Sequence, residues 1–75
     1  MEQITVDPQI LGGKPIIRGT RISVAFILEL LASEVSVQEI LEDYPHLSKE
    51  AIYACLQYAA HAYKNEMYLE LKTAS

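Results

Sequence analysis

Apolar residues recur at helical spacing through the last two thirds of the chain. The segment VAFILELLAS is apolar almost all round, which predicts a central helix that is covered on most sides, with Ser23 as its N-cap. The segment SVQE predicts a capping box, in which Ser36 and Glu39 bond each other's backbone amides. This box begins a short second helix, which Pro45 ends. Its apolar face comprises Val37, Ile40, Leu41 and Tyr44.

A third and longer helix is predicted from Lys49 to about Lys72, with Ser48 as its N-cap. Its apolar stripe comprises Ile52, Leu56, Ala59, Tyr63, Met67 and Leu71. At 1.5 Å per residue this helix would be about 36 Å long and the first helix about 15 Å long. Because the shorter helix cannot cover the whole stripe, we expect Tyr63, Met67 and Leu71 to project from the bundle as an oligomer interface. A frayed C-terminal turn is the alternative.

The first 22 residues follow a different pattern, with short β-prone runs on either side of turn residues. The run QITV is followed by a turn at Gly12 and Gly13, and PIIRGTRI predicts a second extended segment that turns at Gly19. Such a two-stranded element is marginal alone and must pack on helices or on a second chain. The predicted fold is therefore mainly α, a three-helix bundle with a short N-terminal β element. We divide this single domain into residues 1–22 (β element and turn), 23–62 (trihelical core) and 63–75 (protruding helix end).

The composition suits a folded domain, because half of the 75 residues are apolar and about a fifth are charged. The longest apolar run, VAFIL, is far shorter than the roughly 18 residues that a membrane span needs. The N-terminus has neither a basic start nor an apolar signal core, so we expect a cytoplasmic protein without membrane contact. A chain this small, with one cysteine and therefore no internal disulfide, is also expected to enlarge its core by forming a homo-oligomer, a dimer in the simplest case.

Catalytic chemistry has little support in the sequence. His46 and His61 are fifteen residues apart, and no carboxylate stands at a metal-ligand spacing from them. Cys55 lies beside Leu56 on the third helix, where a small buried hydrophobic side chain is a better interpretation than a nucleophile. No phosphate-binding loop is present. We therefore expect a protein that is not an enzyme and that has no catalytic residues, no metal and no cofactor.

Charge is distributed unevenly along this acidic chain, whose net charge is −4. Residues 1–28 carry three cations against two acids, whereas residues 29–75 carry three lysines against eight acids. The second helix, the PHLS turn and the third helix have the outline of a helix-turn-helix, in which Lys49, Tyr53 and Gln57 could contact DNA. Only one of these is a cation and Glu50 would face phosphates, so nucleic-acid binding by this helix is expected to be weak.

The segments GGKPIIRGTRISV and ILELLASEVSVQEILEDYPHLSKEAIYACLQYA carry a resemblance to a known family. Over roughly residues 4–62 the chain resembles the bacterial and archaeal family called domain of unknown function 433. The most specific parts are the Gly-Lys-Pro and Arg-Gly-Thr-Arg runs and the Tyr-Pro before the last helix. The resemblance implies a trihelical, homeodomain-like domain that acts as the antitoxin of a type II toxin–antitoxin pair. The implied partner is a small PIN-like toxin, a ribonuclease that holds a metal in a cluster of carboxylates.

A partner-binding role follows for the glycine-shaped basic segment, whose candidate contacts are Lys14, Arg18, Thr20 and Arg21. The planar arginine side chain suits bidentate pairing with carboxylates such as those of the toxin. Alternatively, Arg18 and Arg21 pair within the chain, with Glu29, Glu39 or Asp43. A second hypothesis is a DNA-binding autoregulator, in which a homodimer combines the cations of two copies. A structural homo-oligomer is the third.

Overall fold

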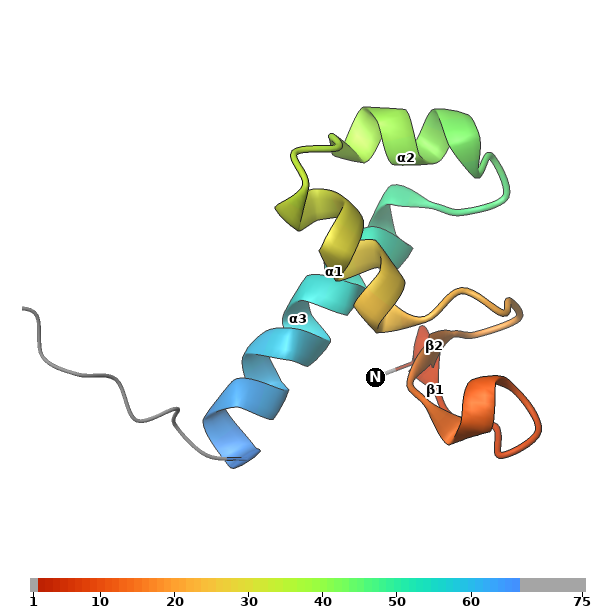
Figure 1. Ribbon diagram of the computed structural model, residues 1–75, viewed down its shortest axis with the longest axis vertical. Coiled ribbons are helices and arrows are strands. Elements are labelled where there is room, and N and C mark those ends of the chain that lie inside the picture. The colour runs from red at the N-terminus through yellow and green to blue at the C-terminus, as the bar shows by residue number, and fades with distance from the viewer. Residues whose placement is uncertain (1, 67–75) are drawn as a thin grey trace, which may run out of the picture.

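The computed structural model describes residues 2–66, which form a two-stranded sheet and three helices (Figure 1). The strands are β1 (Ile4–Thr5) and β2 (Ile16–Ile17), and a short 3-10 turn, η1 (Leu11–Gly13), lies between them. The helices are α1 (Val24–Ala32), α2 (Val37–Asp43) and α3 (Lys49–Glu66). The predicted mainly α fold with a short N-terminal β element is therefore confirmed.

The two strands pair in antiparallel register, Ile4 with Ile17 and Thr5 with Ile16. After β2 the chain turns back, and Ser23 forms an isolated antiparallel bridge with Ile16. All three isoleucines are buried, so the small sheet contributes directly to the core. The predicted turn at Gly12 and Gly13 is also confirmed, because both have positive φ angles, 66° and 83°.

Local side-chain bonds begin all three helices as the sequence predicts. The hydroxyl oxygens of Ser23, Ser36 and Ser48 each accept a bond from the backbone amide three residues later, at 2.9, 3.1 and 3.1 Å. The Glu39 carboxylate in turn accepts from the Ser36 amide at 2.9 Å, which completes the capping box. These bonds satisfy amides that have no partner within the helix.

α1 ends in a Schellman motif. The Val35 amide donates to the backbone oxygen of Leu30, and the Glu34 amide donates to that of Leu31, both at 3.0 Å. Glu34 occupies the position at which glycine is preferred, and its φ angle is 70°. Val35 and Leu30 are both packed against the core, which is the hydrophobic contact typical of this motif.

The central helix is α3, which contacts β1, α1 and α2. Its buried face comprises Ala51, Ile52, Ala54 and Cys55. The prediction that the first helix is covered on most sides is wrong, because only Val24 and Ile27 of α1 are buried and Phe26 is 37% exposed. A domain of this size has too few elements to surround more than one helix.

The predicted apolar stripe of the third helix is only partly correct. Ile52 is fully buried, but Leu56 is 41% exposed and Tyr63 is 51% exposed. The predicted stripe joins residues of the core face to residues of the solvent face. Apolar residues are frequent on both faces of this helix, so spacing alone does not separate them. Figure 1 shows the last described turns of α3 extending past α1 and the sheet. Met67, Leu71 and the predicted helix end at Lys72 lie outside the described residues. None of the helices in residues 2–66 is long and apolar enough to cross a membrane.

Candidate functional site

The basic loop, residues 18–21, connects β2 to Ile22 and is tightly braced by hydrogen bonds. The Ile17 amide donates to the backbone oxygen of Ile22 at 2.9 Å and closes the loop. The Thr20 hydroxyl donates to the oxygen of Ile17 at 2.7 Å and accepts from the Ile22 amide at 2.9 Å. Gly19 has a φ angle of 81°, which other residues rarely adopt. The RGTR sequence therefore specifies a fixed loop shape.

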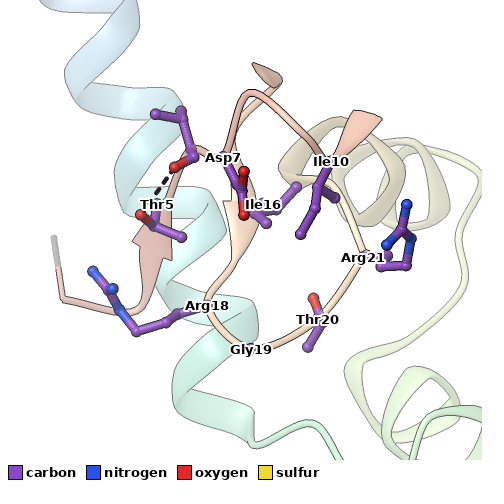
Figure 2. Close-up of a pocket in the computed structure, with 9 residues that line it drawn as sticks. Thr5, Asp7, Ile10, Ile16, Arg18, Gly19, Thr20 and Arg21 are labelled. Carbon is purple, nitrogen blue, oxygen red and sulfur yellow. Dashed lines mark hydrogen bonds between the residues drawn. The ribbon is translucent and has the colours of Figure 1, made fainter. Parts of the chain in front are cut away.

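A hollow of about 520 Å³ lies between this loop and the segment that follows β1 (Figure 2). Its apolar lining comes from Val6, Ile10 and Ile16, and its polar lining comes from Thr5, Asp7 and the four residues of the basic loop. Val6 is 58% exposed although it is a large aliphatic residue. The antiparallel register of β1 and β2 brings these two segments together, so the hollow depends on the fold of the whole N-terminal element.

The two arginines of the loop are exposed and differ in their contacts. Arg18 donates from Nε to the backbone oxygen of Glu2 at 2.6 Å, and its amide donates to the oxygen of Gln3 at 2.8 Å. Arg21 makes no hydrogen bond or ion pair within residues 2–66. Figure 2 shows the two guanidinium groups pointing away from each other on opposite sides of the loop.

The alternative of internal ion pairing does not describe this arrangement. Within residues 2–66, neither Arg18 nor Arg21 forms an ion pair with an acidic side chain. Glu39 is instead committed to the capping box, where the bonds from the Ser36 amide and hydroxyl hold its pKa below the usual value. The positive charge of the loop is thus not neutralised by a contact within the described part of the chain.

The structure brings together three of the four predicted contacts. Arg18, Thr20 and Arg21 line the hollow, whereas Lys14 is exposed but is not among the lining residues. Because both bonding directions of the Thr20 hydroxyl are used within the loop, this side chain acts first as a brace. Asp7 was not predicted and also lines the hollow, where it accepts a bond from the Gln9 amide at 2.9 Å. Val6 and Ile10 were missed as well, since only the strand register places them there.

The predicted DNA contacts lie elsewhere, on the first turns of α3. Lys49, Tyr53 and Gln57 are exposed, and their spacing of four residues places them on one face of the helix. A second hollow, of about 330 Å³, borders this face and is lined by Glu2, Gln3, Glu50, Tyr53, Ala54 and Gln57. Two acidic residues, Glu2 and Glu50, therefore lie beside the face that would meet phosphates. The arrangement is electrostatically unfavourable for nucleic acid.

Cys55 is fully buried, as expected for a small hydrophobic side chain. Burial raises the pKa of its thiol to about 11, because the charged thiolate would lose its hydration. The thiol therefore stays protonated at neutral pH. Among the described residues, no group of three or more His, Cys, Asp or Glu side chains is placed to hold a metal ion.

Comparisons with known proteins agree with the family resemblance noted in the sequence. The profile of a family described as "Protein of unknown function (DUF433)" matches residues 4–59. The chain is 41% identical over 58 residues to the uncharacterized protein y4eO of Sinorhizobium fredii (strain NBRC 101917 / NGR234). This alignment covers 77% of the chain but 26% of the relative, so the chain spans about a quarter of that protein's length. No solved structure matches the chain. The family match includes the basic loop and ends within α3.

Proposed function

This chain belongs to the DUF433 family, and we propose that it is a non-enzymatic, antitoxin-like module that binds and neutralises a small PIN-like ribonuclease in the cytoplasm. One observation carries the proposal. Two exposed arginines, neither in an ion pair within residues 2–66, stand on a braced loop at a hollow with a partly apolar lining, in a chain that is otherwise acidic. Such a loop is better suited to binding an acidic protein surface than to catalysing the reaction of a small molecule.

The chemistry of the contact follows from the two side chains. Each guanidinium can donate two parallel bonds to one carboxylate, and such charge-assisted pairs are stronger and more directional than neutral hydrogen bonds. Because Arg18 and Arg21 point in opposite directions, they would pair with two separate carboxylates. The resemblance implies that PIN-like toxins hold their metal in a carboxylate cluster. Occupying that cluster or its acidic rim would displace metal or RNA.

The hollow would supply the apolar part of the interface. Val6, Ile10 and Ile16 line it, and Val6 is mostly exposed, so an apolar side chain of the partner could cover it. The bonds of Thr20 fix the loop before binding, so less conformational freedom is lost when the complex forms. Preorganisation of this kind favours affinity without adding contacts.

The test is inhibition of the ribonuclease encoded by the neighbouring reading frame, after co-expression and co-purification of the pair. Arg21→Ala should weaken inhibition at least about tenfold, because it removes a charge-assisted pair. It should leave the fold unchanged, since Arg21 makes no internal bond within residues 2–66. Arg18→Ala should weaken inhibition too, with some loss of stability from its bond to Glu2. Lys49→Ala is the matched control, because it removes an exposed cation from a different face.

Three outcomes would count against this function. A double variant, Arg18→Ala with Arg21→Ala, that folds and inhibits as well as the wild type would exclude the basic loop as the contact. A loss of inhibition in Lys49→Ala equal to that in Arg21→Ala would indicate a general charge effect. Failure of the pair to associate at all would remove the toxin as the partner.

The second candidate is a homeodomain-like, helix-turn-helix autoregulator that binds its own promoter. The exposure of Lys49, Tyr53 and Gln57 on one face at the start of α3 supports it. The carboxylates of Glu2 and Glu50 beside that face weigh against it. Titration against the promoter at several salt concentrations distinguishes the two, because each phosphate contact contributes about −0.9 to the slope of log affinity against log salt. Binding that is absent, or independent of salt, both alone and with the toxin, would exclude DNA.

A further inference from the structure

An apolar stripe runs along the solvent side of α3. It comprises Tyr53, Leu56, Ala60 and Tyr63, whose spacings of three, four and three residues match the seam positions of a coiled coil. Tyr53 is 47% exposed, Leu56 is 41% exposed and Tyr63 is 51% exposed. These three are half of the six large hydrophobic side chains that are exposed within residues 2–66. The helix thus has a second apolar face besides the one in the core.

The stripe and the core face are distinct because of helix geometry. Each residue advances about 100° around an α-helix, so Tyr53 and Ala60, seven residues apart, lie nearly in line. Cys55, at the middle of the buried face, is rotated by about 200° from Tyr53. The stripe therefore lies on the side of the helix opposite the buried face, and its Tyr53 end borders Glu2 and Gln3 in the second hollow. A seam of this kind normally faces another helix.

Three polar residues along one edge of the stripe indicate that the helix facing it is α3 of a second copy. Glu50, Gln57 and Lys64 are exposed and follow one another at intervals of seven residues. The acidic group is at one end of this edge, the amide in the middle and the ammonium at the other end. When two such helices run antiparallel, Glu50 of each faces Lys64 of the other, and the two Gln57 side chains face each other. In a parallel pair Glu50 of one copy and Lys64 of the other would lie about 21 Å apart along the axis and could not pair.

We propose that a second copy of this chain docks antiparallel on the stripe and forms a two-fold symmetric dimer. The same surface serves both copies, as two-fold symmetry requires. The seam is only about three turns long, so the dimer is weak and concentration-dependent. It shares no residue with the basic loop, so both loops stay available to partners. It also covers Tyr53 and is therefore incompatible with DNA reading by that face.

The position of the seam is tested by sedimentation of the full chain over a range of protein concentrations. Leu56→Asp places a charge at the middle of the seam and should leave a monomer at concentrations where the wild type is a dimer. Val6→Asp is the matched control, because it places the same charge at an exposed aliphatic residue away from the stripe, and the dimer should persist. A wild type that is a monomer at every concentration, or a Leu56→Asp variant that still dimerises, would overturn the proposal.

The antiparallel arrangement is tested by charge reversal. Glu50→Lys and Lys64→Glu should each weaken the dimer about tenfold, because each change turns two attractive pairs into two repulsive ones. The double variant should restore the wild-type dissociation constant within about threefold. Both reversals oppose the helix dipole, so restoration cannot come from a more stable helix. A double variant as weak as the single variants would overturn the arrangement. Because the toxin is absent from this experiment, its result is independent of the proposed function.

Discussion

The Thr20 hydroxyl offers the sharpest test of how the basic loop is held. It donates to the backbone oxygen of Ile17 at 2.7 Å and accepts from the amide of Ile22 at 2.9 Å, and the side chain is half-buried. Thr20→Val keeps the shape of the side chain and removes both bonds. The Ile22 amide then loses its partner, while the Ile17 oxygen keeps its bond from the Thr20 amide at 3.0 Å.

The expected loss of stability in Thr20→Val follows from these contacts. A buried donor that loses its partner costs about 1–3 kcal/mol, and partial exposure of the loop places this case at about 1–2 kcal/mol. A 75-residue domain has a total stability of about 4–11 kcal/mol, so the loss is substantial. For a domain of this size it corresponds to a decrease of about 5–15 °C in the unfolding midpoint.

The assay is urea unfolding followed by far-ultraviolet circular dichroism, with Thr20→Ser as the matched control. Serine keeps the hydroxyl and loses only a methyl group, so its loss of stability should be less than half that of valine. A Thr20→Val variant as stable as Thr20→Ser would show that the two hydroxyl bonds do not hold the loop.

Three further predictions concern the helices. Glu34→Gly should raise the free energy of unfolding by about 1 kcal/mol in the same assay, because glycine adopts the positive φ angle of this C-terminal cap without strain; a decrease would contradict the cap. Ser36→Ala should lower it by about 1 kcal/mol at neutral pH. Because the fold lowers the pKa of Glu39, the ionised carboxylate stabilises the fold above the usual value of 4.5, and this stabilisation is lost as the pH falls below it. The free energy of unfolding, measured from neutral pH down to pH 3, should therefore decrease less in Ser36→Ala than in the wild type. Cys55, with its pKa at about 11, should react with a thiol reagent only as fast as the domain opens; rapid reaction of the folded protein at neutral pH would contradict its burial.

Local chemistry explains what the sequence predicted correctly. Ser23, Ser36 and Ser48 begin helices because each bonds an amide only three residues away. Gly19 marks the loop because glycine adopts a positive φ angle more readily than other residues. Arg18 and Arg21 could be assigned to one loop because they are only three positions apart along the chain.

Features that depend on distant pairing were missed. The phase of the buried face of α3 was misassigned beyond Ile52, because periodicity does not show which of two apolar faces the other elements cover. Val6 and Asp7 were not recognised as neighbours of the basic loop, because only the pairing of Ile4 with Ile17 brings them there. The opposite directions of the two guanidinium groups also required coordinates.

The proposed contact through the basic loop is tested most directly by calorimetric titration of the Arg21→Ala variant against the proposed PIN-like ribonuclease partner. We expect the dissociation constant to rise at least about tenfold, while the unfolding midpoint changes no more than it does for a neutral surface substitution. An unchanged dissociation constant with the fold intact would contradict it.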